Sequence, residues 1–583
     1  MAFHDIDEDL VGEIDGRVYN NTKGFYEKYF QGRSWSPTVG AIVHNANLAN
    51  VCEIDYPNPP TRSAVLDWFP EFQSAFIPGG RPTYHTFHNL SSNGPDSYRK
   101  PDLFLTLAGA TAGLGDDGKY IWEDVQVIGK VKQTANFKKY QKELLKFCEL
   151  AREVFSCQPT RLFLHGFIIR GYIVELWVFD RSGPYSCEKF NIRNRPDRFI
   201  EVMVGYTMMT GEELGLNTFI KEDENGKYIT VKEDDATESV RLYLGEVPIS
   251  YRRAVVCRGT TCYRAKKQNA WRWEFIVKFS WRSDERPAEG QFLKLAAKRG
   301  VWGVPRLFSH QDLHSIADLR RGLQFGKPRT FIDSAENKDE AKNHNAEESF
   351  KNRILNCLVT YSPGREISAA GSTVELLEAF RDAIKAHMSL YRDGKILHRN
   401  ISDTNIIITR PSREEDPKGM LIDLDQAAEL GGKPIKAMYR PRHLQFMAIE
   451  TLEGDRDYIF RHDLESFLYV FLRVIVDFSE TINDSTGKTS VTRQWDRGTR
   501  SQMASTKFSL MDRERFRTLT NEFAMDYSRL KTLAEELRAL LFPIRHNSCC
   551  IRTFSQYEHE KLYGDMIHAF DKAIDLENSW PTF

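Results

Sequence analysis

The chain has 583 residues, 41% of them hydrophobic and 28% charged, and a formal net charge of −1. This length exceeds one ordinary hydrophobic core and predicts at least two domains. The balanced charge argues against a strongly basic nucleic-acid-binding protein, and no run of about 18 apolar residues predicts a transmembrane helix.

The N-terminal segment is acidic and lacks the basic and apolar regions of a secretory signal. The nine cysteines are scattered without the spacing of zinc ligands. We therefore expect an intracellular protein with reduced thiols, in the cytoplasm or nucleus, and no nucleic-acid or membrane partner.

The first part of the chain, residues 1–235, predicts an α/β domain. Strand-like alternation, a glycine-rich loop and a helical pattern follow one another in this part. The predicted strands cover residues 102–107, 122–129, 161–169 and 172–179, the helix covers 137–156, and the glycine-rich loop covers 108–119.

Within this domain, Asp102 after a proline and a strand ending at Lys132 resemble the PD…(D/E)xK layout of restriction-type nucleases. That layout uses two carboxylates for a metal and a lysine for the attacking water. Lys130 stands in place of the second carboxylate, and a cation there should abolish metal binding. We expect a nuclease-like sheet without a metal, in which Lys130 and Lys132 lie beside Asp102.

Residues 221–238 are polar and acidic, and we interpret them as a domain boundary containing a short hairpin. A second domain is expected over residues 236–575. Residues 327–350 contain almost no core residues and are expected to be a mobile insertion. A helical pattern over residues 373–392 then leads into the central motif.

The central motif, residues 398–405, reads HRNISDTN. It has the spacing of the kinase catalytic loop H-R-D-L-x-x-x-N, with Asn400 at the position of the aspartate. Two apolar strands follow and predict a hairpin that ends at Asp423. In kinases the loop asparagine and the strand-end aspartate hold Mg²⁺, which bridges the ATP phosphates. Asn405 and Asp423 are therefore the candidate metal ligands.

Upstream, Lys278 lies in an apolar strand-like segment and precedes a helical pattern over residues 287–299 that carries Glu289. Kinases keep at this place the lysine that grips the α- and β-phosphates and the glutamate that pairs with it. The phosphate-covering loop would be residues 258–263, with Gly259, Thr260 and Thr261 as its nucleotide-binding residues. It has one glycine where kinases usually show three.

Downstream, Glu450 stands where kinases carry the glutamate of A-P-E, and we expect it to pair with a distant arginine. Asp463 is expected to accept hydrogen bonds from the catalytic-loop backbone, and His398 and Arg399 are expected to be structural residues. The alternative for both carboxylates is a helix cap or an ordinary surface position.

These motifs together resemble the fungal-type protein kinase family. The resemblance rests on residues 161–163, 176–183, 258–261, 277–281, 398–402, 421–425, 444–448 and 462–466. It implies an α+β fold, in which a bilobal protein-kinase-like domain follows the α/β domain with the nuclease-like sheet. It also implies ATP, Mg²⁺ and transfer of the γ-phosphate to Ser or Thr hydroxyls of a protein.

The sequence departs from that family on the substrate side. Asn400 replaces the usual aspartate and cannot accept the proton of a substrate hydroxyl as a carboxylate does. Arg442 and His443 occupy a segment that usually carries a Gly-Thr pair. Two hypotheses remain: a slow Ser/Thr kinase, in which Asp403 is the alternative proton acceptor, or a pseudokinase acting as a nucleotide-binding scaffold or switch.

Overall fold

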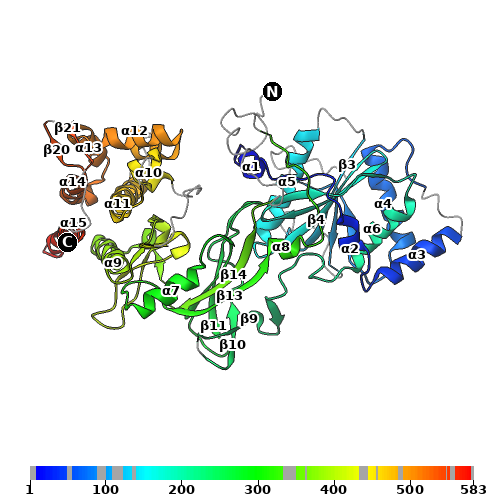
Figure 1. Ribbon diagram of the computed structural model, residues 1–583, viewed down its shortest axis with the longest axis horizontal. Coiled ribbons are helices and arrows are strands. Elements are labelled where there is room, and N and C mark those ends of the chain that lie inside the picture. Colours follow the sequence, from blue (N-terminus) through cyan, green and yellow to red (C-terminus); the bar gives the residue numbers. More distant parts are fainter. Residues whose placement is uncertain are drawn as a thin grey trace. The chain divides into compact units, whose positions relative to one another are not determined.

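The computed structural model (Figure 1) describes most of the chain. The described residues are 8–48, 55–87, 100–107, 122–133, 140–234, 236–331, 350–361, 364–431, 444–454, 457–482, 490–546, 548–551 and 558–579. They form two compact units. The first comprises Met1–Trp271, Val277–Arg286 and Gln311–Cys357, and the second comprises Arg272–Ile276, Pro287–His310 and Leu358–Phe583. Among the described helices, none combines the length and apolar character needed to cross a bilayer.

The first unit contains a mixed sheet with the order β1-β2-β3-β4-β5-β6, and β7 pairs with β5. β3 and β4 are parallel and the other pairs are antiparallel. A parallel pair needs a crossover, which α5 supplies between β3 and β4. The bounds are β1 Thr83–Thr86, β2 Leu103–Thr106, β3 Val125–Lys132, α5 Tyr140–Cys157, β4 Phe163–Arg170, β5 Ile173–Asp180, β6 Gly183–Ser186 and β7 Phe190–Asn191.

Helices cover both faces of this sheet (Figure 1). Side chains of α1 and α5 pack with Phe104, Ile128 and Trp177 in one core cluster. On the opposite face, aromatic residues of α4 and α6 pack together and against the sheet, as in the Phe72–Phe199 and Phe167–Tyr206 pairs. The bounds are α1 Glu8–Ile14, α2 Phe25–Phe30, α3 Ser36–Leu48, α4 Arg62–Phe76 and α6 Pro196–Met208. This part therefore has the predicted α/β character.

A second sheet has the order β13-β14-β12-β11-β10-β9-β8, and the boundary between the two units falls within β12, β13 and β14. The hairpin predicted within residues 221–238 is present as β8 and β9, and β9 continues the sheet by pairing with β10. The bounds are β8 Lys221–Asp223, β9 Gly226–Lys232, β10 Ser239–Leu244, β11 Thr261–Lys267, β12 Phe275–Ser283, α7 Glu289–Lys298, β13 Leu307–Ser315, α8 Ile316–Leu319 and β14 Arg353–Tyr361.

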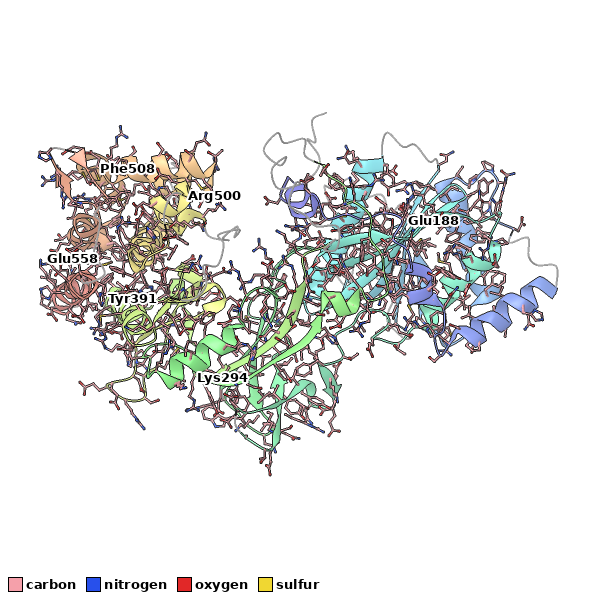
Figure 2. The ribbon with its side chains drawn as sticks, viewed as in Figure 1. Glu188, Lys294, Tyr391, Arg500, Phe508 and Glu558 are labelled. Carbon is pink, nitrogen blue, oxygen red and sulfur yellow. The ribbon has the colours of Figure 1, made fainter. Side chains whose placement is uncertain are left out.

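The second unit is mainly helical around one large core. α11 lies at its centre, with buried residues on every side, and α9 packs against α15, where the Tyr391 ring lies 5.3 Å from that of His559. Figure 2 labels Tyr391 and the neighbouring Glu558. The helices are α9 Thr373–Arg392, α10 Ile449–Glu453, α11 Phe460–Ile482, α12 Arg500–Leu510, α13 Arg513–Thr520, α14 Leu530–Leu541 and α15 His559–Asn578.

Short strands frame the central motif of this unit. β15 (Arg365–Glu366), β17 (Ile406–Ile408) and β18 (Gly419–Leu421) form a three-stranded sheet, and β16 (Ile396–Leu397) pairs with β19 (Ala428–Glu429). The predicted hairpin is β17 and β18, with Ile406 opposite Leu421. A further small pair, β20 (Ile544–Arg545) and β21 (Ser548–Cys549), follows α14.

Three predictions fall outside the described residues, wholly or in large part. They are the glycine-rich loop at 108–119, the greater part of the insertion at 327–350, and the substrate-side segment that contains Arg442 and His443.

Candidate functional site

The candidate site of the second unit is built on the β17–β18 hairpin. The two strands are apolar and buried, so the hairpin fixes the chain positions before β17 and after β18. Arg399 and Asp423, one on each side of the hairpin, have positive φ angles of 64° and 69°. Such a backbone conformation costs about 1–3 kcal/mol at a non-glycine residue and is concentrated at functional sites.

Asn400 joins the two candidate metal ligands. Its Nδ2 donates a hydrogen bond to Oδ2 of Asp423 at 2.7 Å, and its carbonyl oxygen accepts one from Nδ2 of Asn405 at 2.8 Å. Asn405 is buried and Asp423 is half-buried. The structure thus brings Asn400, Asn405 and Asp423 to one point, while their roles stay predictions.

His398 holds the loop against the strand that leads to Asp423. Burial lowers the pKa of His398, so its ring is neutral at pH 7. Nε2 lies 2.9 Å from the carbonyl oxygen of Ile422, and Nδ1 accepts the backbone N–H of Asn400 at 3.2 Å. Both bonds fit a neutral ring protonated at Nε2, which positions Asn400 next to Asp423.

Three carboxylates gather beside this loop. Oxygen atoms of Glu289, Asp423 and Asp425 lie within 4.8 Å of one another. Oε1 of the buried Glu289 accepts the backbone N–H of Leu424 at 3.1 Å. Such oxygen donors, with the Asn405 amide close by, fit Mg²⁺. Sequence reasoning did not single out Asp425; its signal was a second carboxylate two residues after Asp423.

Asp463 is fully buried in the first turn of α11 and contacts the catalytic loop. It accepts the backbone N–H of Arg399 at 3.0 Å, the hydroxyl of Tyr458 at 2.7 Å, and contacts Nε2 of His387 at 2.8 Å. Burial alone raises the pKa of Asp463, but the charge and hydrogen bond of His387 bring the pKa below its ordinary value. Asp463 is therefore an anion that holds the catalytic-loop backbone.

Glu450 lies at the start of α10 and is also buried. Its Oε2 lies 3.4 Å from Nη1 of Arg461 and 3.1 Å from Nε2 of His462. The expected partner was a distant arginine, whereas Arg461 follows closely in the chain because α11 begins soon after α10 ends. Arg461 also pairs with Glu465 at 2.8 Å.

The predicted phosphate-binding residues belong to the first unit. Lys278 is half-buried on β12. Gly259 has a positive φ of 50°, and its carbonyl oxygen accepts the hydroxyl of the buried Thr261 at 3.2 Å. Thr260 lies between them. Because these residues and the carboxylates fall in different units, the Lys278–Glu289 pair stays a prediction.

Asp102, in the first unit, is held by cations and backbone. Oδ1 accepts hydrogen bonds from Arg62 and lies 3.6 Å from Nζ of Lys130, and Oδ2 accepts the N–H of Val131 at 2.8 Å. Burial lowers the pKa of Lys130, and the charge of Lys132 acts in the same direction. These contacts disfavour a metal at Asp102, and the resemblance to a nuclease stays a prediction.

A family model described as fungal protein kinase matches residues 100–475. Among solved structures, a structure of vaccinia related kinase 3 is 12% identical, with a TM-score of 0.32, covering 63% of this chain and 93% of that chain. The search of curated proteins found no match.

Proposed function

The chain belongs to the fungal protein kinase family, and from this premise we propose that it binds ATP with Mg²⁺ and transfers the γ-phosphate to Ser or Thr hydroxyls of a protein. The transfer is proposed to be slow because of Asn400. The observation that carries the proposal is the meeting of Asn400, Asn405 and Asp423 beside a carboxylate cluster.

Each residue has a proposed task in this reaction. Asp423 and Asn405 hold the metal, with Glu289 and Asp425 close enough to Asp423 to contribute oxygen atoms. Bound Mg²⁺ would neutralise the charge that develops on the phosphates. Lys278 and the loop around Gly259 bind the phosphates. His398 and Asp463 hold the loop that carries Asn400.

Asn400 sets the rate. Its carboxamide cannot take the proton of the substrate hydroxyl, and a general base contributes about 10²- to 10⁴-fold to the rate. Its Nδ2 also occupies one oxygen of Asp423. Phosphoryl transfer depends mostly on positioning and charge stabilisation, so the remaining groups support a slow reaction.

A transfer assay with radiolabelled ATP tests this proposal. Asn400→Asp restores a carboxylate of nearly the same size, and we expect transfer to rise by about 100-fold or more. A wild-type protein as fast as this variant would assign proton transfer to another group, and Asp403 would be examined first.

The second candidate is a pseudokinase, a nucleotide-binding scaffold or switch. The hydrogen bond from Asn400 to Asp423 favours it, because the bond occupies one oxygen of the proposed metal ligand. ATP binding without any gain of transfer in Asn400→Asp would establish this alternative. Asp423→Ala should remove the Mg²⁺ dependence of ATP binding in calorimetry under either candidate.

A further inference from the structure

Residues 254–259, here called the anchored loop, lead into the predicted phosphate-covering residues and include Gly259, and residues 254–257 are buried in the first unit. Val255 and Val256 belong to the same core cluster as Leu10 of α1 and Phe155 of α5. A segment of the predicted kinase domain therefore completes the hydrophobic core of the N-terminal domain.

Arg181 fastens the anchored loop from the side of the N-terminal sheet. This fully buried guanidinium donates to the carbonyl oxygen of Ala254 at 2.6 Å and to that of Pro159 at 3.0 Å. It also stacks over the ring of Phe155, 4.2 Å from the ring centroid. A Cβ atom on Gly259 would lie 3.0 Å from Nε of Arg181, a tight approach, and the positive φ of 50° also favours glycine at this position.

Arg181 extends from a rigid turn between β5 and β6. Oδ1 of Asp180 accepts the backbone N–H of Ser182 at 2.8 Å and of Gly183 at 3.2 Å. The buried Arg320 binds both oxygens of Asp180, at 2.7 and 2.8 Å. A bidentate pair of this kind fixes direction as well as distance, so the position of Arg181 is determined by the fold.

Glu13 of α1 fastens the same loop from the other side. Its Oε1 accepts the backbone N–H groups of both Val255 and Val256. Hydrogen bonds to a charged acceptor are stronger than neutral ones, and buried N–H groups left without an acceptor are costly. Glu13 thus satisfies two donors that the buried loop cannot present to water.

The far end of the anchored loop is hydrogen-bonded to β12, the strand that carries Lys278. The carbonyl oxygen of Arg258 accepts the N–H of Trp281 on β12 at 2.6 Å, and the N–H of Gly259 donates to Sγ of Cys257 at 3.1 Å. The loop is therefore held both by the N-terminal domain and by β12.

We propose that Glu13 and Arg181 are positioning residues for nucleotide binding, which hold the anchored loop so that ATP phosphates meet a preformed Gly259 turn. This inference rests on the proposed function, since it concerns the same nucleotide site. It assigns to the N-terminal domain an indirect part in phosphate binding, through the contacts of Arg181 and Glu13 with the backbone of the anchored loop.

Calorimetry on the full-length chain tests the inference, with Mg-ATP and adenosine as ligands. Glu13→Ala removes the acceptor, and we expect ATP affinity to fall about tenfold, while adenosine affinity changes less than about twofold. Glu13→Gln keeps an acceptor oxygen and should retain ATP affinity within about threefold. Asp9→Ala, at an exposed position on the same helix, is the matched control and should bind like the wild type.

Hydrogen exchange of the Val255 and Val256 amides gives a second measurement, because it reports the loop directly. Exchange should accelerate in Glu13→Ala and not in Glu13→Gln. Faster exchange with unchanged ATP affinity would overturn the inference, as would equal loss of ATP and adenosine affinity. A wild-type chain that binds no ATP would instead overturn the proposed function, and the inference with it.

Discussion

At the scale of single residues, the position of Asn400 determines what Asp423 can do. Its amide donates to a carboxylate oxygen at 2.7 Å, so one oxygen of Asp423 already accepts a hydrogen bond. An aspartate at this position would bring a second negative oxygen to the same distance. Two carboxylates that close cannot both ionise unless a cation or a proton lies between them.

Replacement of Asn400 by aspartate should therefore make the thermal stability of the protein depend on bound Mg²⁺. We expect Asn400→Asp to melt at a lower temperature than the wild type in EDTA and to regain that loss when Mg²⁺ is added. Differential scanning calorimetry at pH 7.5 measures both. Asn400→Ala, which removes the hydrogen bond without adding charge, is the control and should not respond more strongly to Mg²⁺ than the wild type. Equal metal responses of all three proteins would contradict the argument.

Lys507 on α12 offers a residue-scale prediction for pH. It is fully buried, donates to the carbonyl oxygen of Met447 at 2.5 Å, and lies 4.3 Å from the ring centroid of Tyr469. Burial lowers the pKa of Lys507 from 10.5 to about 7. Between these values the unfolded chain binds one more proton than the folded chain, so stability increases with pH and is lost as pH falls toward 7.

The free energy of unfolding should therefore rise between pH 7 and pH 9, by up to about 1.4 kcal/mol per pH unit from this one group. Lys507→Met keeps the length of the side chain and removes the titration, so its unfolding should show a smaller pH slope. Urea unfolding of wild type and variant across that range measures the slopes. Parallel slopes would show that Lys507 stays protonated in the folded chain.

At the scale of elements, Asp463 is where α9, α11 and the catalytic loop meet. It holds the Arg399 backbone from α11 and contacts His387 of α9, whose Nδ1 lies 2.7 Å from the hydroxyl of Tyr563 on α15. Removing one partner from a buried ionic network costs about 3–5 kcal/mol. In urea unfolding, Asp463→Ala should lower the free energy of unfolding by an amount in this range. The control is Asp393→Ala, which changes a partly exposed aspartate just after α9 and should lower it far less.

The sequence predicted the elements whose hydrophobic period was clear. The helix over residues 373–392 is α9, because burial on one face imposes a helical period. The hairpin before Asp423 is β17 and β18, whose fully buried strands are short apolar runs. The pairing of β9 with β10 and the nearby partner of Glu450 depend on contacts between elements. The hydrogen bond from Arg181 to Ala254 could not be predicted either, because it joins segments assigned to different domains.

At the scale of the whole molecule, the first unit combines the N-terminal domain with strands of the second sheet. The predicted boundary between residues 235 and 236 stays a prediction. Val255 and Val256 lie in the N-terminal core, and Arg320 is paired with Asp180 in the buried interior. A chain that starts at residue 236 would keep these three residues and lose their partners.

Such a truncated chain, residues 236–583, should not fold as a kinase domain on its own. Exposure of Val255 and Val256 costs about 1.5–3 kcal/mol each, which together is a large fraction of the whole stability of a domain. We expect aggregation, or a soluble chain without ATP binding, in size-exclusion chromatography and calorimetry. Co-expression of residues 1–235 as a separate chain should restore solubility, since it returns Glu13, Phe155, Asp180 and Arg181. A monomeric truncated chain that binds ATP like the full-length protein would show that the N-terminal domain is dispensable to the nucleotide site.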